Sequence, residues 1–239
     1  MRDSSAASPK GPDKGWAGMA KQALIEQRPW LLASIAAATL FYFLSDNPIF
    51  EGTWGLLAKG ASVGLLAVYA AVRVPPGKHR PDGFLLVAVL ALAACGDVAI
   101  ELDFLTGGAF FAAAHMVAVV LYLRNRHARP SPVQKLTGAA LLIGTPLVSW
   151  LLSGQAQIAV YAAFLGAMAS AAWMSHYPRY RVGTGAVLFV LSDWLIFARM
   201  GPLDLEPANT VLIWPLYYAA QIMIATGIVQ CLRGEQPVR

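Results

Sequence analysis

Four ionisable side chains lie inside long apolar segments of the sequence: Lys59, Asp97, His115 and Asp193. An ionisable group at the centre of a bilayer costs about 2.5 to 3.5 kcal/mol on insertion scales, so it needs a partner and marks a candidate functional site. Two carboxyl groups in one site can serve as general acid and general base. Buried Asp, Lys and His side chains also line the pathways of transporters. The residue types alone therefore leave both an enzyme and a transporter open.

Residue counting along each apolar segment places all four side chains between the membrane midplane and the non-cytoplasmic side. We therefore expect them to meet in one cavity, together with three polar residues of the last segment, Tyr217, Tyr218 and Gln221. Glu101 follows Asp97 by one helical turn and is expected on the same helix face.

Each of these residues also has a purely structural interpretation. Lys59 can extend its ammonium group along the helix towards water. His115 can be a hydrogen-bonded interior histidine, and Glu101 can lie at the membrane interface with Asp103. Asp97 and Asp193 can form a buried charge network with Lys59, although two carboxylates at this depth are costly if their role is only structural.

The composition indicates that a membrane positions these residues. The chain has 239 residues, of which 57% are hydrophobic and 13% charged, and its mean hydropathy is +0.55. A soluble domain carries about a quarter charged residues, so this surface is expected to face lipid. The net charge of +5 does not indicate nucleic-acid binding, because the basic residues lie in short gaps between apolar segments.

A hydrocarbon core about 30 Å thick needs roughly 17 to 25 helical residues per crossing. The segments that meet this requirement are 29–45, 53–72, 83–102, 107–123, 134–152, 155–173, 183–200 and 211–232. We therefore predict an all-α fold, a polytopic membrane helix bundle of about eight transmembrane helices. Because only Ser153 and Gly154 separate the fifth and sixth segments, these two should form a tight helical hairpin.

Loop charges predict the orientation. The tail and the gaps after the second, fourth and sixth segments are rich in Lys and Arg, whereas the alternate gaps carry acidic residues or no charge. This alternation predicts that both termini are cytoplasmic. The domain prediction is a flexible basic tail at 1–28, a transmembrane domain at 29–232 and a short C-terminal tail at 233–239. Cys95 and Cys231 show neither metal-site spacing nor a disulfide framework, and we predict no cofactor.

Four short motifs, taken as an ordered set, resemble the YhhN family. They are Gly96-Asp97, Ala114-His115, Phe189 to Ser192-Asp193, and Tyr217-Tyr218-Ala219-Ala220-Gln221. The resemblance covers nearly all of the chain after the tail. Two positions depart from the family pattern: Gly60 follows Lys59 where the family often has proline, and Ala118 stands where a tyrosine commonly follows the histidine.

The resemblance implies a lysoplasmalogenase, which hydrolyses the vinyl ether bond of lysoplasmalogens to a fatty aldehyde and a glycerophospho-head-group product. Under this hypothesis Asp97 and Asp193 are the catalytic carboxyl pair, and His115 orients a carboxylate or the water. Lys59 would bind the lipid phosphate or lower the pKa of one aspartate so that the two carboxyl groups differ. The expected substrate-binding residues also include Tyr217, Tyr218, Gln221, Ser192 and Glu101.

Other functions remain open at this point. The residues Asp97, His115, Glu101 and Asp193 also permit a zinc site, but one histidine is a poor set of ligands, and we predict no metal. A proton-coupled or lipid transporter is the main alternative, and a non-catalytic membrane scaffold is another. The expected partners are a lysophospholipid or ether-lipid substrate within the bilayer and membrane lipids, with no nucleic acid. The expected location is the bacterial inner membrane.

Overall fold

The computed structural model describes residues 28–45, 47–48, 50, 52–75, 77, 79–203 and 205–235. The predicted basic tail lies outside these ranges except for Arg28, and only 233–235 of the predicted C-terminal tail is described. In the described part all regular elements are helices, with a single isolated bridge between Arg126 and Ser175. The prediction of an all-α fold is confirmed.

The helices follow the predicted segments closely. They are α2 (Pro29–Leu44), α3 (Thr53–Arg73), α4 (Arg80–Ala99), α5 (Phe104–Arg124), α6 (Pro132–Ser153), α7 (Ala156–Met174), the π-helical turn η1 (Arg179–Gly183), α8 (Thr184–Ala198) and α9 (Ala208–Leu232). Gly183 leads directly into Thr184, so η1 and α8 form one continuous helical segment.

Seven of these segments are long and apolar enough to cross a membrane: α3, α4, α5, α6, α7, η1 with α8, and α9. The chain is therefore an integral multi-pass membrane protein. The remaining helix, α2, is apolar but has 16 residues. At 1.5 Å per residue it covers about 24 Å, less than a hydrocarbon core of about 30 Å.

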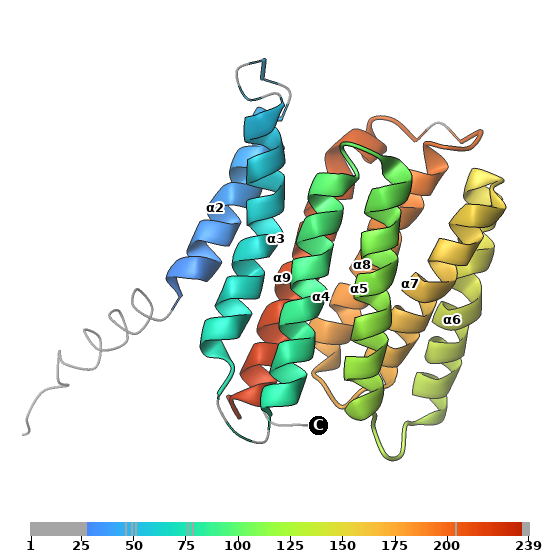
Figure 1. Ribbon diagram of the computed structural model, residues 1–239. Helices are drawn as coiled ribbons and strands as arrows, with labels where there is room; N and C mark the ends of the chain where they lie inside the picture. Colours follow the sequence, from blue (N-terminus) through green and yellow to red (C-terminus); the bar gives the residue numbers. More distant parts are fainter. Residues whose placement is uncertain are drawn as a thin grey trace, which may run out of the picture.

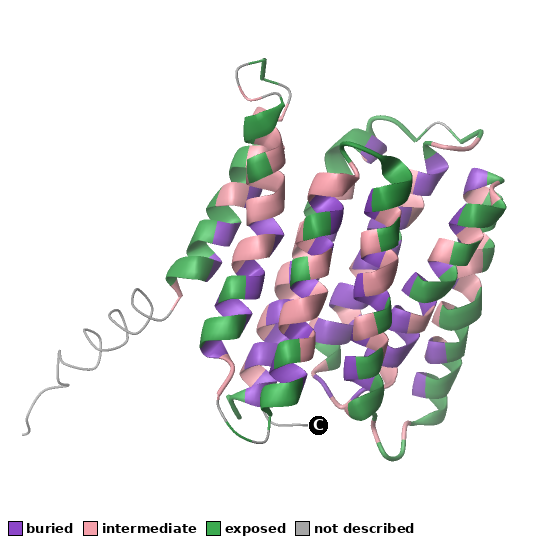
Figure 2. Cartoon of the chain, in the orientation of Figure 1, coloured by how far each residue is buried: buried purple, intermediate pink, exposed green. Residues whose placement is uncertain are grey.

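The helices run alternately up and down the bundle, and most successive helices pack against each other, whereas α5 and α6 do not. α9 passes behind α4 and also contacts α3 (Figure 1). α5 packs against α7, which brings the two halves of the chain together. Figure 2 shows buried residues on the inward helix faces and exposed residues on the outer faces. The outer faces carry large apolar side chains, including Phe43, Leu136, Ile143 and Leu151, as expected for contact with lipid.

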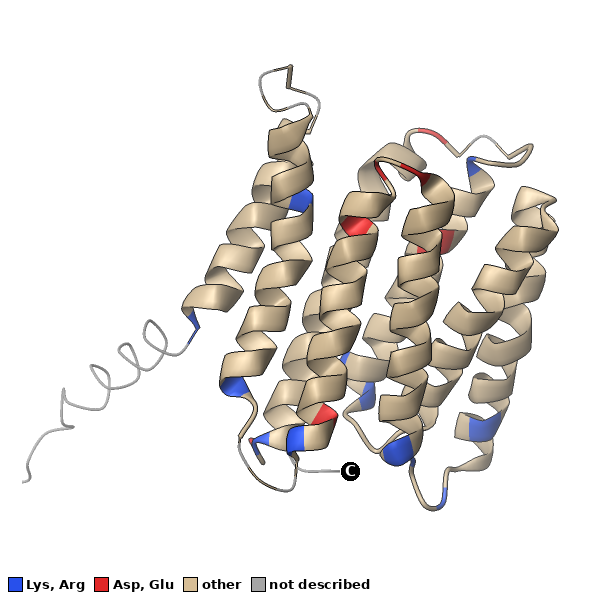
Figure 3. Cartoon of the chain, viewed as in Figure 1, with Lys and Arg blue, Asp and Glu red and all other residues tan. Residues whose placement is uncertain are grey.

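Charged residues gather at the two ends of the bundle (Figure 3). We call one end the basic end; its described Lys and Arg residues at helix termini and loops include Arg73, Arg80, Arg124, Arg126, Arg129, Lys135, Arg179, Arg181 and Arg233. The opposite end holds the turns with Glu101, Asp103 and Glu206. The start of α2 and the end of α9 both lie at the basic end.

Two helix junctions show how the sequence sets the loops opposite the basic end. The α6–α7 hairpin is as tight as predicted, because Gly154 adopts φ 68° and ends α6. Asp103 caps α5: its Oδ2 accepts hydrogen bonds from the Thr106 backbone N–H at 2.7 Å and from the Thr106 hydroxyl at 2.6 Å. The Thr106 hydroxyl and N–H lower the pKa of the Asp103 carboxyl below its usual value.

The α4–α5 junction requires a glycine, which gives a stability prediction. A Cβ at Gly107 would lie 2.5 Å from the Ile100 Cα, whereas a Cβ at the next residue, Gly108, meets nothing within 4 Å. We expect Gly107→Ala to lower the midpoint of thermal unfolding in detergent by several degrees, because backbone at Ile100 must move. Gly108→Ala is the matched control and should unfold close to the native midpoint. Equal midpoints for the two variants would contradict this packing.

Candidate functional site

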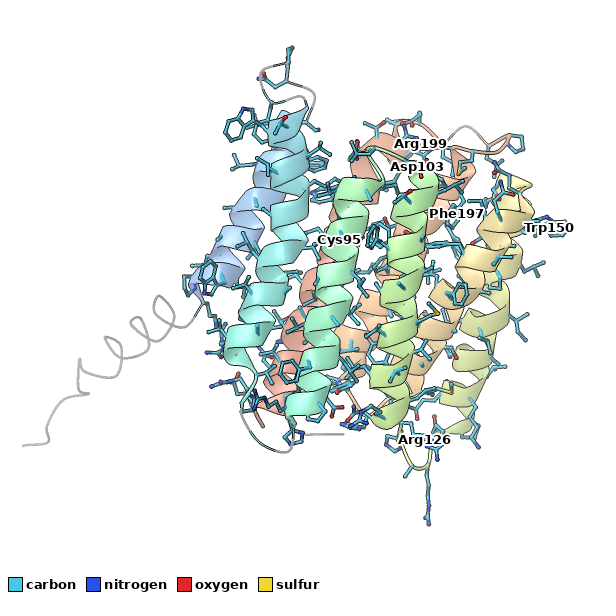
Figure 4. All side chains as sticks on the ribbon, viewed as in Figure 1. Cys95, Asp103, Arg126, Trp150, Phe197 and Arg199 are labelled. Atoms are coloured by element: carbon cyan, nitrogen blue, oxygen red, sulfur yellow. The ribbon has the colours of Figure 1, made fainter. Side chains whose placement is uncertain are left out.

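A cavity of about 300 Å³ lies among α3, α4, α5, α7, α8 and α9. Five residues predicted for the site line it: Lys59, Asp97, Ser192, Asp193 and Tyr217. The rest of the wall is mostly apolar. Figure 4 shows the cavity-lining Phe197 in the half of the bundle near Asp103 and Arg199, far from Arg126 at the basic end. The cavity therefore lies in the half of the bundle opposite the basic end.

The cavity has apolar residues on its outer side. Leu105 and Ala109 of α5 and Val160 and Phe164 of α7 all line it, and all four are exposed on the bundle surface. Because exposed apolar residues of these helices face lipid in a membrane, the cavity opens sideways between α5 and α7. A molecule with a hydrocarbon chain can enter by this route without crossing water.

Asp97 is held by two residues of α9. The Tyr217 hydroxyl donates to Asp97 Oδ2 at 2.7 Å, and Gln221 Nε2 donates to the Tyr217 oxygen at 3.2 Å. All three residues are buried. The single hydroxyl proton of Tyr217 is used by Asp97, so its oxygen can only accept from Gln221. This chain fixes the orientation of the carboxyl and the Gln221 amide together.

Asp193 has a second chain of the same kind. The hydroxyl of Tyr161, on α7, donates to Asp193 Oδ2 at 2.8 Å, and the Tyr161 oxygen lies 3.2 Å from His115 Nε2. Because Tyr161 gives its only proton to Asp193, His115 must donate through Nε2 in this arrangement. Each aspartate is therefore held by one tyrosine, and each tyrosine by one further side chain.

Aromatic rings pack edge to face between the two hydrogen-bonded chains. Phe189 lies edge-on to both Tyr217, with ring centroids 5.2 Å apart, and His115, at 5.1 Å. Phe111 contacts Tyr217 and Phe189 in the same manner, at 5.9 and 6.1 Å. Such edge-to-face contacts are favourable beyond the area they bury. They restrict the rotamers of the residues that hold the carboxyl groups.

Lys59 forms an ion pair with Glu101, and its ammonium lies 5.6 Å from the centre of the Phe41 ring. Glu101 does not line the cavity, and its side chain is 47% exposed. It is also not on the helix face expected for it, because α4 ends at Ala99 and Glu101 lies in the following turn. Lys59 itself does line the cavity, so a ligand there can compete with Glu101 for the ammonium group.

The structure does not bring every predicted residue to the cavity wall. His115 and Gln221 line a smaller neighbouring cavity instead. Tyr218 turns towards α2, where its hydroxyl lies 2.7 Å from the Ser34 hydroxyl. Ser192 lines the cavity, but its hydroxyl donates to the Ile213 carbonyl at 2.9 Å and so is engaged in the contact between α8 and α9.

Sequence reasoning missed Tyr161, which lines the cavity and holds Asp193. The sequence position of Tyr161 could have indicated its role. It is the one tyrosine of the apolar segment 155–173 and lies well inside it, away from the interfaces where tyrosine is enriched. Trp214 of α9, which also lines the cavity, was not predicted either. Within the described ranges, no three His, Cys, Asp or Glu side chains are placed to hold a metal ion.

The fold and the site together define a class: a polytopic membrane protein with a paired-carboxyl cavity that opens towards lipid. The sequence profile of the YhhN family matches residues 54–228, which include every residue of the two hydrogen-bonded chains, and the protein belongs to the YhhN family. The resemblance noted from the sequence motifs is confirmed. No curated protein and no solved structure matches the chain.

Proposed function

We propose that the protein is an intramembrane lipid hydrolase, and specifically a lysoplasmalogenase that cleaves the vinyl ether bond of lysoplasmalogens. One observation carries the proposal: Asp97 and Asp193, each held by a tyrosine, line a single cavity whose opening faces lipid. Membership of the YhhN family supports the same activity.

The reaction begins with protonation of the β-carbon of the vinyl ether. One carboxyl group donates this proton and the ether becomes an oxocarbenium ion, which the second, ionised carboxyl group stabilises. The second carboxylate then takes a proton from a water molecule while the oxygen of that water adds to the cation. The resulting hemiacetal collapses to a fatty aldehyde and the glycerol hydroxyl of the head-group product. Either aspartate can fill either role in this scheme.

The remaining parts of the substrate fit the cavity wall. Apolar residues of α5 and α7 would contact the alkenyl chain, which enters from the bilayer. Lys59 is the one cation among the described cavity-lining residues, and we assign it to the lipid phosphate. Lys59 and Asp97 line the same cavity, so the phosphate and the vinyl ether of one lipid molecule can bind there at once.

We further propose that the basic end faces the cytoplasm of a bacterial cell, because Lys and Arg are enriched in cytoplasmic loops. Both termini are then cytoplasmic, and the cavity lies within the opposite leaflet. Under this orientation a lysolipid would reach the carboxyl pair from the outer leaflet of the cell membrane.

The test is release of fatty aldehyde from lysoplasmenyl-ethanolamine by the purified protein in detergent with added lipid. We expect aldehyde from this substrate and none from the 1-acyl lysophosphatidylethanolamine of equal chain length, which has an ester in place of the vinyl ether. A folded, lipid-supplemented protein that releases no aldehyde would contradict the assignment. Transport of the lipid across proteoliposomes would then be the next activity to measure.

A further inference from the structure

A second cavity, of about 20 Å³, lies beside the larger one. Phe111 and Phe189 line both cavities. Three polar side chains line the smaller cavity, namely His115 and Tyr122 of α5 and Gln221 of α9. The exposed fractions of these residues are 3%, 1% and 2%, so none of them reaches bulk solvent.

Each of these side chains keeps at least one hydrogen-bonding group that no other described residue uses. Among the described residues, His115 is bonded through Nε2 and Gln221 through Nε2, which leaves His115 Nδ1 and Gln221 Oε1 as acceptors without a protein partner. The Tyr122 hydroxyl likewise has no hydrogen-bond partner in the described part of the chain. Since His115 must donate through Nε2 to Tyr161, its Nδ1 is an acceptor in the neutral ring. The three side chains thus present two acceptors, His115 Nδ1 and Gln221 Oε1, and two donors, the Tyr122 hydroxyl and the second N–H of Gln221.

We propose that the smaller cavity is a binding site for one structural water molecule. The volume exceeds the roughly 10 to 15 Å³ that a water molecule needs, and a buried water usually makes about three hydrogen bonds. The two protons of the water would be donated to His115 Nδ1 and Gln221 Oε1, and its oxygen would accept from the Tyr122 hydroxyl. His115 Nδ1, Gln221 Oε1 and the Tyr122 hydroxyl then each have a hydrogen-bond partner, as buried polar groups require.

This water joins the hydrogen-bonded chain of Asp97 and the hydrogen-bonded chain of Asp193 into one network. The path runs from Asp97 through Tyr217 and Gln221 to the water, and from the water through His115 and Tyr161 to Asp193. The water thereby sets the orientation of the Gln221 amide and of the His115 ring, and through them the donor direction of both tyrosines. Tyr122, which does not touch the larger cavity, becomes a positioning residue for both aspartates.

Structure determination of the protein at a resolution that shows ordered water tests the site directly. We expect density in the smaller cavity within hydrogen-bond distance of His115 Nδ1, Gln221 Oε1 and the Tyr122 hydroxyl. A smaller cavity without density, in a map that shows other buried waters, would overturn the proposal. This result does not depend on the hydrolase activity, so failure of one proposal leaves the other standing.

A double-mutant cycle measured by thermal unfolding in detergent gives an independent test. Tyr122→Phe and Gln221→Leu should each lower the midpoint, and the double variant should lose at least about 2 °C less than the sum, because both residues act through the same water. The matched control pairs Tyr122→Phe with Ser34→Ala on α2, for which we expect additive losses. Additive losses for Tyr122 with Gln221 would show that no water couples them.

Discussion

Asp97→Asn and Asp193→Asn are each expected to lower the rate of aldehyde release by about 10²- to 10⁴-fold, the range of general acid or base catalysis. An asparagine has nearly the shape of aspartate and its amide oxygen still accepts the tyrosine hydrogen bond seen at either position. It can neither donate an acidic proton nor take one from water. The loss should therefore appear in kcat, with an unfolding midpoint near the native value.

The matched control for these variants is Asp103→Asn. Asp103 caps α5 outside the cavity, and asparagine caps helices as well as aspartate does. We expect this variant to retain native aldehyde release, which would show that loss of a carboxylate near the site is not enough to stop turnover. Full activity in both Asp97→Asn and Asp193→Asn would exclude the carboxyl pair as the catalytic groups.

Gly108→Trp is expected to lower the efficiency of aldehyde release strongly by filling the cavity. Gly108 lines the cavity and a Cβ there meets nothing within 4 Å, so a side chain at this position can grow into open space. An indole would occupy much of a cavity of about 300 Å³ and exclude the alkenyl chain. We expect kcat/KM for aldehyde release to fall by about 100-fold or more, because the substrate must bind in this space before reaction.

Gly108→Ala provides the size control, since one methyl group leaves most of the cavity open. We expect it to retain aldehyde release within a few-fold of the native protein. The unfolding midpoint of Gly108→Trp should stay close to that of Gly108→Ala, so the loss of activity can be read as loss of space. Native activity in a folded Gly108→Trp protein would place the reaction elsewhere in the bundle.

The paired tyrosines explain how two carboxyl groups are kept in fixed directions inside an apolar bundle. Each aspartate accepts a hydrogen bond from one tyrosine, which in turn accepts one from Gln221 or His115. Buried polar groups are stable only when they are hydrogen-bonded, so these chains are needed whatever reaction the site performs. The proposed reaction adds the requirement that both carboxyl groups line the same cavity, which a purely structural network does not need.

The helical segments could be predicted from the sequence alone because a membrane acts on each segment separately. A span must be apolar over roughly 17 to 25 residues and must satisfy its own backbone hydrogen bonds, so composition and length identify it. The predicted segment 53–72 matches α3 (Thr53–Arg73) within one residue. The segment 83–102 matches α4 less closely, since the helix ends at Ala99 and leaves Glu101 in the turn. The costly residues Asp97 and Asp193 were found by the same local reasoning.

Only the tertiary structure decided which side chains meet. Interior and lipid are equally apolar, so hydropathy does not show which face of a membrane helix turns inward. That choice depends on close packing between helices, as at Gly107 against Ile100, which involves residues of two segments at once. Helix packing places Tyr161 against Asp193, directs Tyr218 towards Ser34, and positions His115 beside a separate cavity. The sequence by itself determined the spans and their unusual charges, and helix packing decided how those charges are paired.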